Sequence, residues 1–187
     1  DATWTANTDT EFTVEHYYQN ANDDGYEKVE TETKYGTTGA TVNGADYNKA
    51  LAEAIFERAE SKTVNADGTT VIKVYYVRTS YTLTFTYGDK AGENSEYTLR
   101  YGQSVSYNPY FSVVGYVFAG WDAEIPATMP AENVTINATW TSGNVQFTVE
   151  HYYQNANDDG YTKVDSETKY GTTDATVIGA DYRKALA

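Results

Sequence analysis

The chain has 187 residues, with 13 basic and 27 acidic side chains, a net charge of −14 at pH 7 and no cysteine. This charge argues against nucleic acids and anionic membranes as partners, because both bind proteins through basic surfaces. A secreted eukaryotic module of this size usually carries disulfides, so a chain without cysteine is more typical of a bacterial surface protein or a cytosolic one. No apolar run approaches the roughly 18 residues of a membrane-spanning helix, and we expect no membrane insertion in this segment.

The first elements in chain order form a hairpin. Residues 12–18 alternate between apolar and polar side chains, which predicts a strand. Residues 22–25, Asn-Asp-Asp-Gly, are typical of a tight turn in which Gly25 takes a positive φ. Residues 26–35 then predict the returning strand.

A helix is predicted over residues 47–59, with Asp46 as its N-cap. Its apolar stripe consists of Tyr47, Leu51, Ala54 and Ile55. Residues 71–77 carry β-branched and aromatic side chains on both faces, which predicts a central strand. The first module is therefore expected to be α+β, with one helix packed on a mixed sheet.

The pattern restarts after Arg78, and four further strands are predicted over residues 81–87, 97–107, 115–121 and 134–140. Each unit of the chain then spans about 60–70 residues, a size at which one core contributes little stability. The 19 tyrosines, with phenylalanine and tryptophan, are expected to supply much of the buried area. The fold class we expect is mainly β.

The first module returns at the end of the chain. Of the 41 residues from Phe12 to Ala52, 35 are identical at Phe147–Ala187, 135 positions later. The six differing pairs are Glu27/Thr162, Glu30/Asp165, Thr31/Ser166, Gly39/Asp174, Asn43/Ile178 and Asn48/Arg183. Residues 2–5 also match residues 138–141. We expect a segment of a tandem array, an architecture used for reach or multivalency.

The second module resembles a known repeat. Its segments TLTFTYG, YGQSV, GYVFAGW and NVTINATW, between Tyr81 and Trp140, resemble the Listeria–Bacteroides repeat, the internalin B-repeat type. The preceding segment, with FTVEHYYQNANDDGY and NADGTTVIKVYY, resembles a MucBP-type (mucin-binding protein) module. These resemblances imply β-grasp, ubiquitin-like modules in a wall-attached, extracellular surface protein of a Gram-positive bacterium. The second module departs by a short GDKAGENSEY connection, and the first by its predicted helix.

Four parts of the chain are expected. Residues 1–8 end a preceding B-repeat-like module, residues 9–79 form the MucBP-like module, residues 80–142 the B-repeat-like module, and residues 143–187 a truncated second copy of the MucBP-like module. This copy lacks a counterpart of the strand at residues 71–77. We therefore expect an unpaired sheet edge in it, covered by a neighbouring molecule or by the preceding module.

No catalytic motif is present in the sequence. His16 and His151 occupy the same repeat position, and none of the HExxH, GxSxG, GxGxxG or P-loop spacings occurs. A carboxylate pair for glycoside hydrolysis stays open, because such a pair is recognised only in three dimensions. We expect a protein that is not an enzyme. An internal Lys–Asn isopeptide bond also stays open.

Two candidate binding sites remain. The oxygens of Asn20, Asn22 and Asp24 follow the first half of a calcium-binding EF-hand loop, but Thr31 stands where the closing glutamate belongs. A plain hairpin turn explains these residues better, so we expect no metal and no cofactor, with calcium as the weaker alternative. Exposed tyrosines can stack on sugar rings, although packing within the sheet is the commoner role of tyrosine. If a ligand is bound, the candidate contacts are Tyr17, Tyr26, Tyr75 and Tyr76.

The leading interpretation is a stalk segment of a bacterial cell-surface adhesin, monomeric, with its modules packed end to end. The alternative is a weak, multivalent module that binds host mucin or another glycoprotein.

Overall fold

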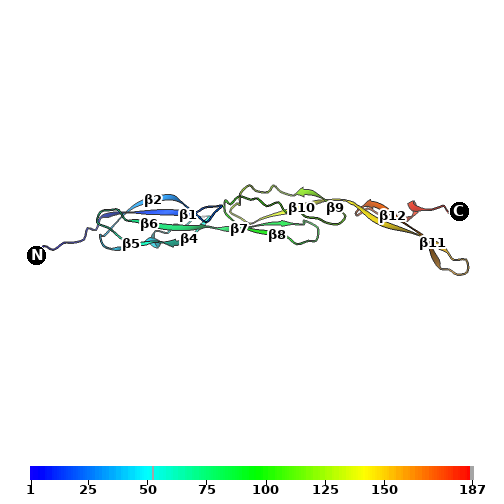
Figure 1. Cartoon of the computed structure of the whole chain (residues 1–187), viewed down its shortest axis with the longest axis horizontal. Helices are drawn as coiled ribbons and strands as arrows, with labels where there is room; N and C mark the ends of the chain where they lie inside the picture. Colours follow the sequence, from blue (N-terminus) through cyan, green and yellow to red (C-terminus); the bar gives the residue numbers. More distant parts are fainter. Residues whose placement is uncertain (52, 186–187) are drawn as a thin grey trace. The chain divides into compact units, whose positions relative to one another are not determined.

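The computed structural model describes residues 1–51 and 53–185, and these are almost entirely strands and connecting loops (Figure 1). The elements in chain order are β1 (Thr10–Gln19), β2 (Tyr26–Gly36), β3 (Thr41–Asn43), the 3₁₀ helix η1 (Gly44–Tyr47), β4 (Ala54–Ala59), β5 (Ser61–Thr63), β6 (Val71–Arg78), β7 (Ser80–Thr86), β8 (Ser95–Arg100), β9 (Tyr116–Trp121), β10 (Val134–Ser142), β11 (Asn144–Gln154), β12 (Tyr161–Thr172) and the 3₁₀ helix η2 (Gly179–Tyr182).

The first sheet has the strand order β2-β1-β6-β4. β1 pairs antiparallel with β2 and parallel with β6, and β4 pairs antiparallel with β6, so the sheet is mixed, as the sequence predicts. One face carries the core, formed by alternate residues of the two central strands together with single residues from the flanking segments. Its fully or almost fully buried members are Phe12, Val14, Ala54, Val64, Ile72, Val74 and Tyr76.

The helix predicted over residues 47–59 is wrong. The chain forms the short 3₁₀ helix η1, capped by Asn43, and then the strand β4 on the edge of β6. Residue 52, within the predicted helix, lies outside the described residues. Leu51 and Ala54 do pack on the core, as the predicted stripe requires, but Ile55 is 60% exposed. Adjacent residues on opposite faces are the signature of a strand.

The described residues contain no α-helix. The β-grasp arrangement implied by the resemblance, with a helix laid across the sheet, is therefore not confirmed. No helix among them is long and apolar enough to cross a membrane.

The turn between β1 and β2 is closed by a hydrogen bond from Asn20 N to Gly25 O (2.8 Å). Gly25 does not have the positive φ that the turn sequence suggests. A Cβ at this position would lie 2.9 Å from Asn20 Nδ2 and 2.9 Å from Asp23 Oδ1. A larger residue would therefore have to displace the hydrogen-bonded side chains of Asn20 and Asp23, so space and not backbone conformation favours glycine here.

The second sheet has the strand order β8-β7-β10-β9, with β10 antiparallel to β9. The strand predicted over residues 97–107 is shorter than expected, since β8 ends at Arg100. A turn follows it, closed by Gln103 N donating to Arg100 O (2.9 Å), with Gly102 at a φ of 75°. Buried apolar side chains of this region are Leu83, Phe85, Leu99, Phe111, Met129, Ile136 and Ala138.

The repeated segment forms a sheet of two strands, β11 and β12. Its antiparallel register repeats that of β1 and β2, including the bulge at His151/Tyr152, which matches the bulge at His16/Tyr17. No other strand of the described residues belongs to this sheet, so the expected open edge of β11 is confirmed. Residues 186 and 187 of the repeat lie outside the described part of the chain.

The chain divides into two compact units. The first comprises residues 1–84, 96–107 and 125–135, and the second comprises residues 85–95, 108–124 and 136–187. The module boundaries expected near residues 79 and 142 each lie inside one of these units.

Candidate functional site

Three of the four candidate tyrosines lie together on the solvent-facing side of the first sheet. Tyr17 of β1 stacks on Tyr75 of β6 with their ring centroids 5.3 Å apart, and Tyr26 of β2 meets Tyr75 edge-on at 5.2 Å. Their side chains are half-buried. Tyr76 points to the opposite face, lies in the core and is 0% exposed, so it takes no part in this cluster.

Cationic side chains cover the rings of this cluster. The Arg58 guanidinium lies 4.1 Å from the Tyr75 centroid and 5.1 Å from the Tyr26 centroid, and Lys73 Nζ lies 5.4 Å from the Tyr17 centroid. We call Tyr17, Tyr26, Tyr75 and Arg58 the tyrosine face. A sugar ring stacking on Tyr75 would have to displace Arg58 or Tyr17. The geometry thus favours packing across the sheet over a free aromatic platform.

The hydroxyls of Tyr17 and Tyr26 in the tyrosine face are also engaged. Tyr17 donates to Glu15 Oε2 (2.7 Å), which raises the pKa of Tyr17 to about 12. Tyr26 donates to Glu57 Oε2 (2.5 Å). Lys28 Nζ donates to Glu15 Oε1 (2.8 Å) and is the main cause of the lowered pKa of that carboxyl. Few polar groups are left free to orient a ligand.

A buried histidine lies on the core side of the same sheet. His16 is 1% exposed, and its Nδ1 is 3.0 Å from the hydroxyl of Tyr76, whose oxygen also accepts the backbone N–H of Lys49 (3.0 Å). Because that oxygen already accepts a hydrogen bond, the Tyr76 proton is available to His16 Nδ1. The contact suits a neutral His16 with its proton on Nε2, and Nε2 faces Glu32 Oε1 at 3.6 Å without a hydrogen bond. Burial lowers the pKa of His16.

Lysines neutralise the carboxylates beside His16. Lys34 Nζ lies 2.6 Å from Glu32 Oε2, Lys49 also pairs with Glu32, and Lys49 Nζ lies 2.7 Å from Glu30 Oε1. The hydrogen bonds from Lys34 and Lys49 lower the pKa of Glu32 to about 2. These contacts form a closed network. It runs from the Lys49 backbone to Tyr76, on to His16 and Glu32, and back to the Lys49 side chain, and it connects β1, β2, β6 and the segment after η1.

The second copy repeats the histidine, carboxylate and lysine part of this network. Ligand atoms of His151, Asp165 and Glu167 lie within 4.8 Å of one another, a set of donors that suits a transition metal. Lys184 contacts both carboxylates, and Lys169 Nζ lies 2.6 Å from Glu167 Oε2. In both copies a lysine ammonium thus occupies the position between the carboxylates that a cation would take.

The calcium candidates have other partners. Asn20 Nδ2 donates to Asp23 Oδ1 (2.7 Å), which tightens the turn. Asn22 Oδ1 accepts from Ser104 N (2.8 Å), and Asp24 Oδ1 accepts from Arg100 Nη2 (2.6 Å). These side chains are directed to the turn itself, to the end of β8 and to the segment after it.

The contacts around this turn form a junction between the first sheet and the start of the second. Arg100 Nη1 also donates to Asp23 O (2.7 Å), and Arg78 Nη1, at the end of β6, donates to Tyr101 O (3.4 Å). A backbone hydrogen bond from Tyr101 N to Thr79 O (2.8 Å) extends this junction. We call these contacts the first junction; all of them lie within the first compact unit.

A second junction lies within the other unit. Gly115 O accepts from both Gly143 N (2.7 Å) and Thr173 Oγ1, and Thr173 N donates to Gly143 O (2.9 Å). The Tyr116 hydroxyl donates to Asp174 Oδ2 (2.6 Å), which raises the pKa of Tyr116. We call these five residues the second junction.

Part of the second junction recurs at the start of the chain. Thr38 N donates to Asn7 O (2.8 Å), and this bond corresponds to the one between Thr173 and Gly143. Asp174 has a φ of 64°, where the first copy has Gly39 at 81°. The aspartate accepts an unfavourable backbone conformation at a position where its carboxylate reaches Tyr116.

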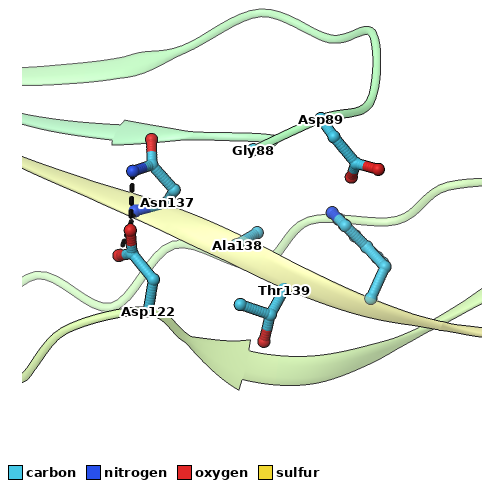
Figure 2. A pocket seen from close by; sticks show the side chains of 7 residues that line it. Gly88, Asp89, Asp122, Asn137, Ala138 and Thr139 are labelled. Carbon is cyan, nitrogen blue, oxygen red and sulfur yellow. Dashed lines mark hydrogen bonds between the residues drawn. The ribbon is translucent and has the colours of Figure 1, made fainter.

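A shallow depression of about 550 Å³ lies in the second unit, lined by Gly88, Asp89, Asp122, Asn137, Ala138, Thr139 and Trp140. Figure 2 shows Asp122 beside Asn137, which donates to it through both its backbone N (2.7 Å) and its Nδ2 (2.7 Å). The side-chain bond from Asn137 is the main cause of the lowered pKa of Asp122. Trp140 Nε1 donates to Tyr87 O (2.8 Å). These polar groups of the depression bond to one another or to the backbone, so few of them are free to bind a ligand.

Sequence reasoning missed the junction residues Arg78, Arg100, Gly115, Tyr116 and Thr173. The difference between Gly39 and Asp174 in the two copies was the one sequence feature that could have indicated the second junction. It looks like an ordinary substitution on an exposed surface.

A scan of protein-family models finds no match to this chain, and a search of curated proteins finds none either. Among solved structures, the chain is similar to Streptococcal High Identity Repeats in Tandem (SHIRT) domains 3-4 from a cell surface protein, with 12% sequence identity and a TM-score of 0.24. The similarity covers 69% of this chain and 96% of that chain. A TM-score of this size establishes no common fold, so the proposal below rests on the chain's own residues.

Proposed function

We propose that the chain is a spacer segment, part of the stalk of an extracellular repeat protein on a bacterial surface, which projects a distal binding region away from the cell. Its role is mechanical and not catalytic. The resemblance of residues 81–140 to the Listeria–Bacteroides repeat and the acidic composition support the surface location.

The observation that carries the proposal is that the module boundaries are bridged by hydrogen bonds. At the first junction, Arg100 contacts the turn after β1 at Asp23 and Asp24, and Tyr101 N donates to Thr79 O. At the second junction, a single carbonyl on one side of the boundary, Gly115 O, accepts from Gly143 N and Thr173 Oγ1 on the other side. Bridged boundaries restrict bending between neighbouring modules, which a spacer requires and a flexible tether does not.

The tyrosine face argues for the spacer over the mucin-binding alternative. Its rings contact one another and Arg58, and the hydroxyls of Tyr17 and Tyr26 bond to glutamates of the same sheet. The mucin alternative stays a prediction. It requires glycan-dependent binding of the chain to immobilised mucin, lost when the glycans are removed enzymatically.

The stiffness of the first junction tests the proposal. The chain has no cysteine, so spin labels on Thr31→Cys and Thr98→Cys, both at exposed positions, are the only labels present. We expect one narrow distance distribution by pulsed electron resonance, broadened by Arg100→Ala. Lys28→Ala is the matched control, because the Lys28–Glu15 ion pair stays within one sheet. A broad distribution in the otherwise unaltered chain, unaffected by Arg100→Ala, would contradict the spacer.

A further inference from the structure

The first and last long strands of the first module lie side by side and run in the same direction (Figure 1). β1 opens this module and β6 closes it, and their register runs from Thr13 opposite Val71 to Tyr18 opposite Tyr76. The start of β1 therefore lies at one end of the pair, and the end of β6 lies at the other. Tension transmitted through the chain on either side of the module pulls these two points apart along the strand axes, so the pair is loaded in shear.

Shear loads the hydrogen bonds between β1 and β6 together. In a parallel pair these bonds are evenly spaced along the strands, so all of them resist the same sliding movement. Strands that are peeled from one end lose the same bonds one after another. Gradual slippage is also disfavoured, because the next register that keeps the core side chains on their own face lies two residues away, about 6–7 Å along the strand.

Hydrogen bonds close the β1–β6 pair at both ends. Thr13 N donates to Thr70 O (2.9 Å) where the pair begins. Where it ends, Arg78 Nε donates to Gln19 O (2.7 Å) and Arg78 N donates to Gln19 Oε1 (3.3 Å). The two places at which separation of the strands would start are therefore both held.

Side chains connect the two strands on both faces of the sheet. On the core face, His16 Nδ1 lies 3.0 Å from the hydroxyl of Tyr76, and both residues are almost fully buried. On the opposite face, Tyr17 stacks on Tyr75, and Arg58 of β4 covers the Tyr75 ring. Water does not reach the buried bond between His16 and Tyr76, so breaking it by sliding leaves two buried polar groups unpaired.

The second module has the same arrangement of its first and last strands. β7 opens it, β10 closes it, and the two are neighbours in the second sheet. Thr82 N donates to Asn133 Oδ1 (2.8 Å), and Thr86 Oγ1 donates to Asn137 Oδ1 (2.6 Å). The partners advance by four residues in the same direction on both segments, which indicates a parallel pair.

We propose that the β1–β6 pair is a mechanical clamp, which keeps the first module folded when the chain is under tension. The proposal rests on the spacer function proposed above, because a spacer carries tension when its distal region is held and the cell is pulled away. A module that unfolded under this load would lengthen the spacer and release the junctions. The clamp thus adds resistance to force to the stiffness that the junctions provide.

Pulling on the full chain from chosen points tests the clamp. The chain has no cysteine, so handles for optical tweezers attach only to introduced residues. Asp9→Cys with Ser80→Cys loads β1 and β6 in shear. Asp9→Cys with Ala66→Cys, in the exposed turn before β6, pulls both strands at the same end and peels them apart. We expect the unfolding force to be at least about twofold higher in shear than in peeling.

Two tyrosine hydroxyls provide matched variants. Tyr76→Phe removes the hydroxyl of β6 that bonds to His16 of β1, whereas Tyr17→Phe removes a hydrogen bond to Glu15 that stays within β1. In shear at constant force, we expect Tyr76→Phe to unfold about fivefold faster and Tyr17→Phe to unfold within about twofold of the unaltered rate. In peeling, Tyr76→Phe should change the rate less, because the bonds there break in succession.

Equal unfolding forces in shear and in peeling would overturn the clamp. An equal acceleration by Tyr76→Phe in both geometries would also overturn it, because the hydroxyl would then support the fold in general and not its resistance to sliding. Each unfolding event is assigned to the first module by the chain length released, about 3.3–3.6 Å for each residue between the handles. Failure of the spacer proposal is seen separately, in the distance distribution across the first junction, which is measured without force.

Discussion

At the scale of single residues, His16 links the core to solution pH. Its folded pKa is lowered by burial below the ordinary value of 6.5. The unfolded chain then binds more protons than the folded chain as pH falls below about 6.5, so acid favours unfolding in this window. Glu32 affects stability at lower pH. Because its folded pKa is about 2, below the ordinary value of 4.5, it stabilises the fold above pH 4.5, and this stabilisation is lost as the pH falls towards 2.

We therefore expect His16→Gln to flatten the pH dependence of the unfolding free energy as the pH falls below 6.5. The measurement is urea denaturation at several pH values across this range, with unfolding monitored by a signal from the first sheet. His151→Gln, at the same repeat position but less buried, is the matched control. An unchanged slope in His16→Gln would show that another group causes the acid sensitivity.

A comparison of two glycines distinguishes the cost of backbone strain from the cost of steric contact. Gly39 and Gly115 have nearly equal positive φ values, 81° and 84°. A Cβ on Gly39 meets no atom within 4 Å, whereas a Cβ on Gly115 would lie 2.8 Å from Thr173 Oγ1 and 3.0 Å from Val145 Cγ1. The two positions carry the same conformational cost, but only Gly115 lies in the second junction.

Gly39→Ala should cost about 1–2 kcal/mol through the left-handed conformation alone. Gly115→Ala should cost at least about 1 kcal/mol more, because the added methyl overpacks the second junction. The free energy of unfolding gives the totals, and amide exchange at Gly143 and Thr173 gives the local effect. Equal costs for the two variants would mean that the junction opens freely and contributes no stability.

At the scale of elements, β4 is where helix propensity and sheet pairing compete. In the predicted helix, Ala54 and Ile55 both belong to the buried stripe. In the strand they point to opposite faces, and they are 5% and 60% exposed. Ile55→Lys should therefore change the unfolding free energy by no more than about 0.5 kcal/mol.

Ala54→Asp, by contrast, places a charge in the core and should cost several kcal/mol. Both values come from urea denaturation. A large loss in Ile55→Lys would favour the helix over the strand.

The strands with strict alternation were predicted close to their observed bounds because burial on one face dictates a period of two. The helix failed because Ala-rich propensity is a weak preference that pairing overrides. β6 has apolar side chains on both faces and an edge left open by β1, and β4 completes its pairing. The bulge between Phe56 and Arg58 also hides the alternation of β4 in the sequence.

The candidate site was predictable only in part. The sequence identifies Tyr17, Tyr26 and Tyr75 as candidates, but the neighbour that decides their role, Arg58, lay in the wrongly predicted helix. The same holds for Asn22 and Asp24, whose partners Ser104 and Arg100 lie about 80 residues away in sequence. Contacts between distant segments leave no local pattern, so no reading of the turn alone could find them.

At the scale of the whole molecule, repetition places an open strand edge and a high negative charge in one chain. An unpaired edge is a template for pairing with other chains, and natural proteins protect such edges with charge. The net charge of −14 at pH 7 falls towards zero near the isoelectric point of about 4.4. Mutual repulsion between copies should weaken over the same range.

We therefore expect the chain to be monomeric at pH 7.5 and low salt and to self-associate near pH 4.5, measured by sedimentation velocity. If β11 provides the contact, Thr148→Pro should reduce association at pH 4.5 without changing the behaviour at pH 7.5, since proline removes a backbone donor from the open edge. Salt at pH 7.5 should act in the same direction as acid but more weakly, because it screens the charges without removing them. A chain that stays monomeric at pH 4.5 would show that the open edge of β11 needs no electrostatic protection.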